Sequence, residues 1–177
     1  MGNGFDTVSV RRATKSDIGA IRRVLAANAA DASLFQQSGH RIRRDLDDFV
    51  IATEDGRPVG CAALHRHTRA NAEILAVAVD PVAHSRGVGA LLMRACLTET
   101  ARSGATFVWL ATAKPEYFAR YEFRPMTKWT LPPRVVLRKF RLVFEQPVRR
   151  WVPALLGRHT FMRLPVAPNS GVPTPSQ

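Results

Sequence analysis

The residues best suited to chemistry are two glycines separated by one residue, Gly87 and Gly89, which follow an apolar run and open a stretch of helical periodicity. Glycine lets the backbone come close to a ligand and leaves several N–H groups free to point outward. The N-terminus of a helix adds about half a positive charge, and Arg86 adds a full charge beside it. Together these features predict a site for a pyrophosphate group. Its predicted residues are Ser85, Arg86, Gly87, Val88, Gly89 and Ala90.

Taken alone, the Gly-X-Gly pattern has competing interpretations. Its glycines also fit a loop that only needs to turn. A Rossmann dinucleotide site requires a third glycine, but Leu92 stands at that position and no acidic residue follows at the required distance. The Lys-Ser/Thr pair of a Walker nucleotide site is absent as well. The sequence on either side of the turn therefore has to distinguish between these interpretations.

The stretch from Val77 to Leu92 resembles motif A of the GNAT superfamily of acetyltransferases. The usual form of that motif is Gln/Arg-x-x-Gly-x-Gly/Ala after a strand ending in Val-x-Pro; here His84 stands at the Gln/Arg position. The resemblance runs from about Val8 to Phe123. It implies that acetyl-CoA is the co-substrate, that it binds along Val77, Ala78 and Val79 with its pyrophosphate on Ser85–Ala90, and that no metal is needed.

Acetyl transfer to an amine needs a base, and Glu73 is the predicted one, acting directly or through a water. Strand alternation would place Glu73 on the same face as Leu75, Val77 and Val79, at the far end of the strand from the phosphates. Ala72-Glu73-Ile74 also matches the segment that carries the base in relatives resembling histone acetyltransferases. The competing interpretation is a solvated glutamate at the start of a strand. For the oxyanion, the resemblance points to a backbone N–H near Val77.

The leaving thiolate also needs a proton donor. Many GNAT enzymes use the tyrosine of a Tyr-x-x-x-Gly-Phe motif, but here Phe118 takes the tyrosine position and Glu122 the glycine position. Phe118 then remains a predicted contact of the cofactor. Tyr117 is the predicted replacement for the tyrosine, with Tyr121 as a second candidate; packing roles for both and protonation by water are the alternatives.

Several segments look like the acetyltransferase domain of bacterial N-acetylglutamate synthases, among them 48–56, 60–64, 73–81 and 117–123. This suggests a small-molecule amine acceptor, such as the α-amine of glutamate or of a similar acidic amino acid. Arg11, Arg12 and Arg120 are candidate clamps for its carboxylates, the alternative being that they are surface charges. Two other functions stay open: acetylation of a protein or peptide, and a non-catalytic acyl-CoA-binding module that engages a partner.

Most of the positive charge is concentrated near the C-terminus. Residues 124–163 hold ten basic residues and one acid, which gives +9 of the net charge of +12. The pattern predicts a basic amphipathic helix over 132–144. Such a helix fits packing on the sheet with solvated arginines, or contact with an acidic partner, a second subunit in a homodimer or an anionic membrane surface. The segment carries no recognisable nucleic-acid motif, which disfavours a nucleic-acid partner.

Composition indicates a cytoplasmic globular protein of 177 residues. No apolar run is long enough to span a membrane, and Met1–Asp6 has neither a basic start nor an apolar stretch of the kind found in secretory signals. Cys61 and Cys96 have no close metal-ligand spacing, and we expect both to be buried thiols.

The elements that would position these residues alternate between strands and helices. Strands are predicted over 8–11, 49–53, 59–65, 72–79, 106–111, 124–130 and 159–164, with helices over 18–29, 41–48, 87–102 and 115–121. In the longest helix we expect Val88, Leu91, Leu92 and Ala95 to face the core. This order predicts an α/β protein with the GNAT fold, a central mixed, mostly antiparallel sheet flanked by helices and followed by a basic helical extension. Residues 1–164 would form the domain, with 124–164 as its basic part, and 165–177 a disordered tail.

Overall fold

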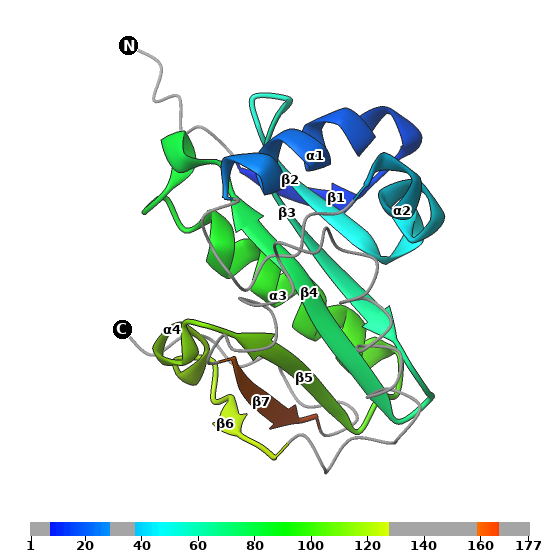
Figure 1. Cartoon of the computed structure of the whole chain (residues 1–177), viewed down its shortest axis with the longest axis vertical. Coiled ribbons are helices and arrows are strands. Elements are labelled where there is room, and N and C mark those ends of the chain that lie inside the picture. Colours follow the sequence, from blue (N-terminus) through cyan, green and yellow to red (C-terminus); the bar gives the residue numbers. More distant parts are fainter. Residues whose placement is uncertain (1–7, 29–37, 128–158, 167–177) are drawn as a thin grey trace, which may run out of the picture.

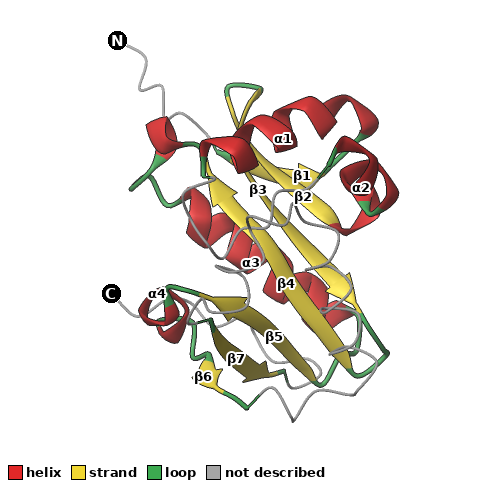
Figure 2. Cartoon of the chain, in the orientation of Figure 1, coloured by secondary structure: helices red, strands yellow, loops and turns green. Residues whose placement is uncertain are grey.

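A computed structural model describes residues 8–28, 38–127 and 159–166, which form one seven-stranded sheet with helices on both faces (Figures 1 and 2). Its strand order is β1-β2-β3-β4-β5-β7-β6, and every neighbouring pair is antiparallel except β4 and β5. The predicted fold class, an α/β protein with a mixed and mostly antiparallel sheet, is therefore confirmed.

The strands are β1 Ser9–Arg12, β2 Phe49–Glu54, β3 Arg57–Arg66, β4 Asn71–Val79, β5 Phe107–Thr112, β6 Arg124–Pro125 and β7 Thr160–Pro165. The helices are α1 Ile18–Ala27, α2 Gly39–Arg44, α3 Val88–Arg102 and α4 Pro115–Ala119, with short 3₁₀ turns η1 Lys15–Asp17, η2 Leu46–Asp48 and η3 Pro81–Ala83. Most predicted elements are found within a few residues of their expected bounds. The predicted helix over 132–144, and most of the basic segment and the tail, lie outside the described residues.

Local sequence accounts for two of the clearest boundaries. Asp55 and Gly56 form the whole turn between β2 and β3 and both have positive φ, 49° and 75°, as a two-residue hairpin requires. Before α1, the carboxylate of Asp17 accepts a hydrogen bond from the backbone N–H of Thr14 at 2.8 Å, as in a capping box with aspartate in place of the usual glutamate.

The sheet carries a separate apolar core on each face. Helix α3 covers one face, where Leu92 and Cys96 pack with strand residues such as Val108. Helix α1 covers the other, where Ile21 and Val24 pack with Ile51. Burial of both helix faces is the main driving force that holds these elements on the sheet.

The buried stripe of α3 differs in part from the prediction. Val88 and Leu92 are buried as expected, but Leu91 and Ala95 are only partly buried. The positions that continue the stripe are Met93, Cys96, Leu97 and Thr100. The helix is thus rotated about its axis relative to the prediction, because its contacts with the sheet select the stripe.

Strand β4 contains a bulge, which sequence periodicity did not predict. Ala76 has a positive φ of 54°, and the pairing with β3 moves from Ala63↔Leu75 to Cys61↔Ala78. Three steps along β4 therefore oppose two steps along β3, which is the definition of a β-bulge.

The bulge changes which face each side chain of β4 meets. Leu75 packs in the α1 core, whereas Val77 and Val79 pack in the α3 core. The prediction that Glu73, Leu75, Val77 and Val79 share one face is wrong, because the extra residue at the bulge reverses the alternation. Glu73 stays with Leu75 on the α1 side.

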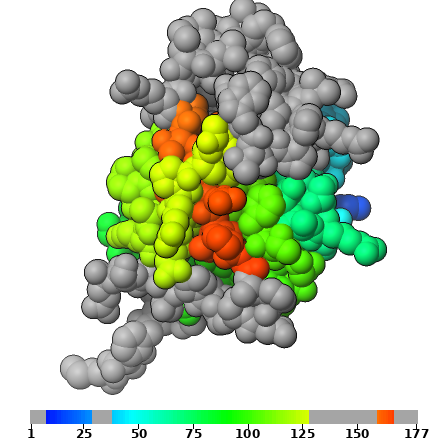
Figure 3. Space-filling model, turned by 90° about the horizontal axis from the view of Figure 1, so that it is seen from below, coloured from blue at the N-terminus to red at the C-terminus, as the bar shows by residue number. Residues whose placement is uncertain are grey.

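The last strand lies between two segments that precede it in sequence. Strand β7 pairs with β5 on one side and with β6 on the other, and Figure 3 shows its residues between these neighbours at the surface. Pro165 still pairs with Phe107, and the N–H of Val166 donates to the carbonyl of Thr106 at 2.9 Å. The sheet therefore extends past the predicted start of the tail at residue 165.

Candidate active site

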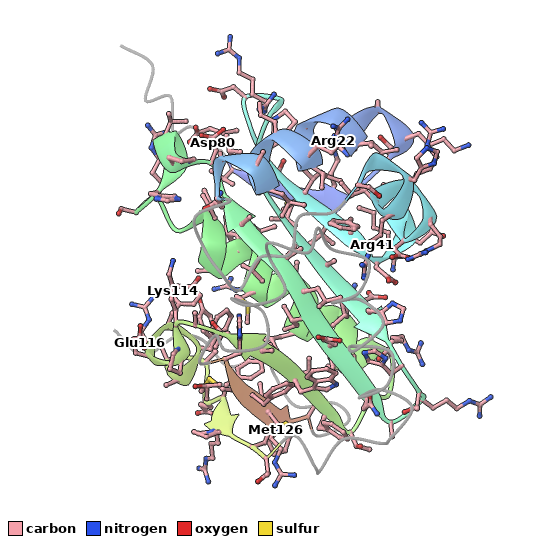
Figure 4. The ribbon with its side chains drawn as sticks, in the orientation of Figure 1. Arg22, Arg41, Asp80, Lys114, Glu116 and Met126 are labelled. Carbon is pink, nitrogen blue, oxygen red and sulfur yellow. The ribbon has the colours of Figure 1, made fainter. Side chains whose placement is uncertain are left out.

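The sheet is open between its two parallel strands. Strands β4 and β5 pair only at Asn71–Phe107, Ala72–Val108 and Glu73–Trp109, although both continue for several residues. Figure 1 shows them diverging toward the end where α4 begins. In Figure 4, Asp80 and Lys114, which follow β4 and β5, mark the two sides of this opening.

Because of this divergence, the edge of β4 from residue 74 to 79 has no strand partner on the β5 side among the described residues. Apart from the carbonyls of Ala76 and Val79, which side chains already contact, backbone groups on the unpaired side of this edge could pair with an extended ligand that carries amides. The opening therefore runs from Glu73 at its closed end, where β4 and β5 stop pairing, to the predicted phosphate turn at its open end.

The predicted phosphate turn has the backbone geometry of an anion site. Ser85 and Gly87 have positive φ values of 64° and 77°, and α3 begins directly afterwards at Val88. The first N–H groups of a helix lack an intrahelical partner. A Cβ on Gly87 would meet no atom within 4 Å. This side of the turn is open to a ligand, so the residues fit a bound pyrophosphate.

Residues next to the turn hold its start in place. The His84 ring is hydrogen-bonded through Nε2 to the carbonyl of Val79 at 3.0 Å, and the carboxylate of Asp80 accepts from the N–H of Val82 at 3.2 Å. His84, which departs from the family motif, thus ties the turn back to the end of β4.

Arg86, predicted to supply charge to the pyrophosphate, is paired with an acid. Its Nη1 lies 2.8 Å and 3.0 Å from the two carboxylate oxygens of Glu54 at the end of β2. The Arg86 side chain is 53% exposed. Such an exposed ion pair is weak and exchangeable, because water and salt screen it.

Tyr117 lies across the opening at its phosphate end. Its Oη would be 2.6 Å from a Cβ on Gly89, and it lies 3.4 Å from the Oη of Tyr121. Burial, together with this hydrogen bond, raises the pKa of Tyr117 above its usual value. Phe118, the predicted cofactor contact, is buried and packs edge-to-face against the Tyr117 ring.

Glu73 is buried at the closed end of the opening. The residue is 2% exposed, so the interpretation of a solvated glutamate is wrong. Its Oε2 is hydrogen-bonded to Nε2 of His67 at 2.9 Å. A carboxylate with little water around it and a specific titratable partner is a candidate for acid–base chemistry.

Glu73 and Tyr117 are not brought together. Tyr117 lies at the level of Val79 and Gly89, six residues along β4 from Glu73, which corresponds to roughly 20 Å of extended strand.

Aromatic and histidine side chains missed by the sequence analysis surround Glu73. The His67 ring stacks on Trp109, with centroids 5.6 Å apart, and Trp109 stacks on Phe161 at 6.2 Å. His65 lies opposite Glu73 in the β3–β4 register, and its Nδ1 is hydrogen-bonded to Asp48 at 2.5 Å. The available signal was the pattern His-x-His where β3 ends, with His65 inside the strand and His67 just beyond it.

The three predicted carboxylate clamps do not converge on Glu73. Arg11 makes two hydrogen bonds to Asp17, at 2.7 Å and 2.9 Å, and Arg12 pairs with Glu99 at 2.8 Å. Both lie on β1, three strands from β4. The third, Arg120, lies over the Tyr117 ring, with its guanidinium carbon 5.2 Å from the centroid.

Two further predictions concern thiols and membrane-spanning segments. Cys61 and Cys96 are buried as expected, and burial raises the pKa of each thiol to about 12. Across the described ranges, no helix has the length and apolar character needed to cross a bilayer. The same ranges contain no group of three or more His, Cys, Asp or Glu residues arranged to hold a metal ion.

The comparison with family models identifies the class of the protein. The model of the acetyltransferase (GNAT) family matches residues 20–123, and the chain belongs to this family. It is accordingly an acetyl-CoA-dependent N-acetyltransferase, and acetyl-CoA is its co-substrate, as the sequence predicted.

Individual relatives show which members of the family the chain resembles. The chain is 27% identical over 126 residues to an uncharacterised N-acetyltransferase, CT2212, of Chlorobaculum tepidum, covering 71% of this chain and 81% of the relative. It is also 27% identical over 125 residues to the amino-acid acetyltransferase of Escherichia coli K12, covering 70% of this chain. That second alignment spans only 28% of the E. coli protein.

Two solved structures share the fold closely. Rv2747 of Mycobacterium tuberculosis, in complex with CoA and a second ligand, has a TM-score of 0.75 at 24% identity and covers 90% of this chain and 99% of that one. N-acetylglutamate synthase of Neisseria gonorrhoeae, complexed with CoA and N-acetyl-glutamate, has a TM-score of 0.75 at 22% identity. It covers 91% of this chain and 35% of that one.

Proposed function

We propose that the protein transfers the acetyl group of acetyl-CoA to the α-amine of glutamate or of a similar small acidic amino acid, with Glu73 as the general base. The observation that carries this proposal is the path along β4. It begins at a buried carboxylate where β4 and β5 separate, and it ends at a glycine turn that opens a helix.

The cofactor would lie along this path. Val77, Ala78 and Val79 offer backbone groups to its amide-containing arm, and Ser85–Ala90 hold the pyrophosphate with the N-terminus of α3. The bulge at Ala76 turns the neighbouring peptide out of the regular ladder. This supports the N–H of Val77 as the donor to the oxyanion.

The chemistry requires one base and one proton donor. Glu73 removes a proton from the incoming ammonium, so that the amine lone pair can attack the thioester carbon. The position of Tyr117 near Gly89 favours a contact with the phosphate end of the cofactor over protonation of the thiolate. We therefore assign protonation of the thiolate to water.

The acceptor is inferred from the relatives. The amino-acid acetyltransferases and the N-acetylglutamate synthase act, by their names, on amino acids. Because Arg11 and Arg12 are paired with acids, a carboxylate of the acceptor would have to displace Asp17 or Glu99 to use them.

A panel assay tests the acceptor. The full-length protein is incubated with acetyl-CoA and, in separate reactions, L-glutamate, L-glutamine, L-aspartate, polyamines and short peptides, and thiol release is followed. Release that is fastest with L-glutamate or L-aspartate is expected. Release with peptides alone would replace the proposal with a peptide N-acetyltransferase.

Replacement of the base tests the mechanism. Glu73→Gln keeps the size of the side chain but cannot accept a proton, and we expect kcat to fall about a hundredfold or more. The dissociation constant for CoA, measured by calorimetry, should change less than about twofold, because Glu73 lies away from the phosphate turn. A variant as fast as the wild type would remove Glu73 from the mechanism.

A further inference from the structure

We propose that His67 is a positioning residue for the general base: its Nε2–H donates a hydrogen bond to the carboxylate of Glu73 and keeps that group ionised and fixed in orientation. This inference rests on the proposed role of Glu73 as the base. It assigns a function to a histidine that the acetyl-transfer chemistry itself does not use, and in it His67 carries no proton to or from the substrate.

The proton in this hydrogen bond belongs to His67. Oε2 of Glu73 and Nε2 of His67 lie 2.9 Å apart, a normal hydrogen-bond distance. An ionised carboxylate has no proton to donate and can only accept. The bond therefore requires a proton on Nε2, which is present in the cationic ring and in one of the two neutral tautomers. As long as Glu73 is ready to act as a base, Nε2 is its donor.

Glu73 needs such a donor because it is removed from water. Its side chain is only 3% exposed, and the side chain of His67 is 7% exposed. Loss of water favours the neutral acid, which cannot take a proton from an ammonium group. A hydrogen bond donated to the carboxylate favours the ionised form instead, and such charge-assisted bonds are roughly twice as strong as neutral ones. The bond from His67 thus opposes the effect of burial on the base.

The neighbours of Glu73 in the sheet hold the imidazole ring. Trp109 on β5 stacks on the ring of His67, with centroids 5.6 Å apart and planes 24° apart. His65 on β3 meets the same ring edge to face, with centroids 4.8 Å apart. Trp109 and His65 are also the residues that pair with Glu73 in the two adjacent strands. The row of residues that flanks the base therefore also sets the direction of its donor.

The backbone that carries His67 is fixed as well, although this residue lies just beyond β3. The N–H groups of His67 and Thr68 donate to the carbonyl of Asn71 at 3.2 Å and 3.3 Å, which closes the turn between β3 and β4. In the same turn, the carbonyl of Ala70 accepts from the N–H of Thr106 at 2.8 Å. Figure 1 shows the end of β3 and the start of β5 on either side of the first part of β4. The donor is therefore in place before the substrate arrives, as a preorganised site requires.

Two variants of nearly equal size separate the donor from the bulk of the side chain. His67→Gln keeps an N–H donor for Glu73, whereas His67→Met has none. Both are assayed with acetyl-CoA and L-glutamate, or with whichever amine of the panel turns over. We expect kcat of His67→Met to fall at least about tenfold and His67→Gln to recover most of that loss, with the KM for acetyl-CoA unchanged in both.

CoA affinity, measured by calorimetry, reports whether each variant is folded. His67→Phe keeps a ring against Trp109 but has no donor, so it should behave like His67→Met. It takes the place of His67→Met in the comparison if that variant does not bind CoA.

A double variant shows whether His67 acts through Glu73. Glu73→Gln leaves no carboxylate for His67 to hold, so the addition of His67→Met should lower its residual kcat less than about twofold. A further loss as large as the one in the wild type would overturn the positioning role. If Glu73→Gln is slow while His67→Met retains wild-type kcat, or while His67→Gln and His67→Met lower kcat equally, the positioning role is overturned and the proposed base stands. A Glu73→Gln variant as fast as the wild type would overturn the base and this inference together.

Discussion

Gly89 and Tyr117 should be strongly coupled in stability, because the structure places the tyrosine hydroxyl where a side chain at position 89 would begin. A Cβ built on Gly89 lies 2.6 Å from Oη of Tyr117, whereas ordinary contact begins near 3.4 Å. The hydroxyl would have to retreat by about 0.8 Å, the difference between these distances. Because Tyr117 also packs against Phe118 and Tyr121, we expect Gly89→Ala to lower the free energy of unfolding by about 1–2 kcal/mol.

Removal of the hydroxyl should reverse the sign of that effect. Without Oη, the nearest atoms to the added Cβ are Cζ of residue 117 at 3.7 Å and Cγ2 of Val79 at 3.8 Å, both ordinary contacts. Alanine is favoured over glycine inside a helix by about 1 kcal/mol. In the Tyr117→Phe background, Gly89→Ala should therefore be neutral or stabilising by up to about 1 kcal/mol. The coupling energy of the two substitutions, the difference between these two effects, is then about 1–3 kcal/mol.

Urea unfolding of the four proteins measures this coupling directly. The midpoints give the changes in stability provided that the m-values agree. Tyr117→Phe alone should cost no more than about 1 kcal/mol, because it removes one long hydrogen bond to Tyr121. If Gly89→Ala lowers the free energy of unfolding equally in the wild-type and Tyr117→Phe backgrounds, Tyr117 is not the reason for glycine at position 89. The close contact between α4 and the start of α3 would then be refuted.

Three further predictions concern the phosphate turn and the N-terminus of α1. Gly87→Val should raise the dissociation constant of CoA about tenfold, measured by calorimetry, because a β-branched residue is strained at a φ of 77°; unchanged affinity would place the cofactor elsewhere. Glu54→Gln should tighten CoA binding by about two- to fivefold at low salt, since it frees Arg86 and removes a negative charge from the site; weaker binding would mean that Glu54 positions Arg86. Asp17→Asn should destabilise the protein by about 1.5–3 kcal/mol at neutral pH. The hydrogen bond from Arg11 holds the pKa of Asp17 far below its usual value, so this stabilisation is present above the unfolded pKa near 4, shrinks as the pH falls below it, and vanishes only below the depressed folded pKa; a difference between variant and wild type that does not shrink between about pH 5 and pH 2 would refute it.

The sequence predicted the parts of the fold that are set by nearby residues. The start of α1 at Ile18, the two strands that flank Asp55 and Gly56 and the turn before α3 all depend on conformational preferences within a few residues. The same holds for the phosphate turn, whose glycines and helix start are contiguous. A motif of this kind can be read from a window of sequence because its geometry is local.

The two glycines of that turn nevertheless have different physical roles, which the pattern does not distinguish. Gly87 has a positive φ and open space around it, so it is required by its backbone conformation. Gly89 lies within the helix and is required by the hydroxyl of Tyr117, which comes from a helix 28 residues later in the chain. The resemblance to a phosphate-binding motif attributes both glycines to contact with the ligand. Gly89 is also required by packing within the protein, because the Tyr117 hydroxyl occupies the space of a side chain at this position.

Features that depend on register between distant strands were not predictable in this way. The bulge at Ala76 is visible only as a mismatch between β3 and β4, and alanine gives no sign of a positive φ. The partnership of Glu73 with His67 depends on how the chain turns between those strands. The prediction from strand alternation is wrong at the bulge because it assumes that every residue of a strand pairs with one residue of its neighbour.

The bulge at Ala76, which breaks the alternation, has a function in the proposed mechanism. A regular β4 would direct Glu73 and Val77 to the same face and would keep the peptide at residue 77 inside the ladder. The bulge instead leaves the carboxylate on the α1 face, packs Val77 on the α3 face and takes the intervening backbone out of its pairing with β3. One strand can then present a base from its side chain and an oxyanion donor from its backbone a few residues apart. Restoring a regular register by deleting Ala76 should therefore abolish acetyl transfer even if the protein still folds and binds CoA.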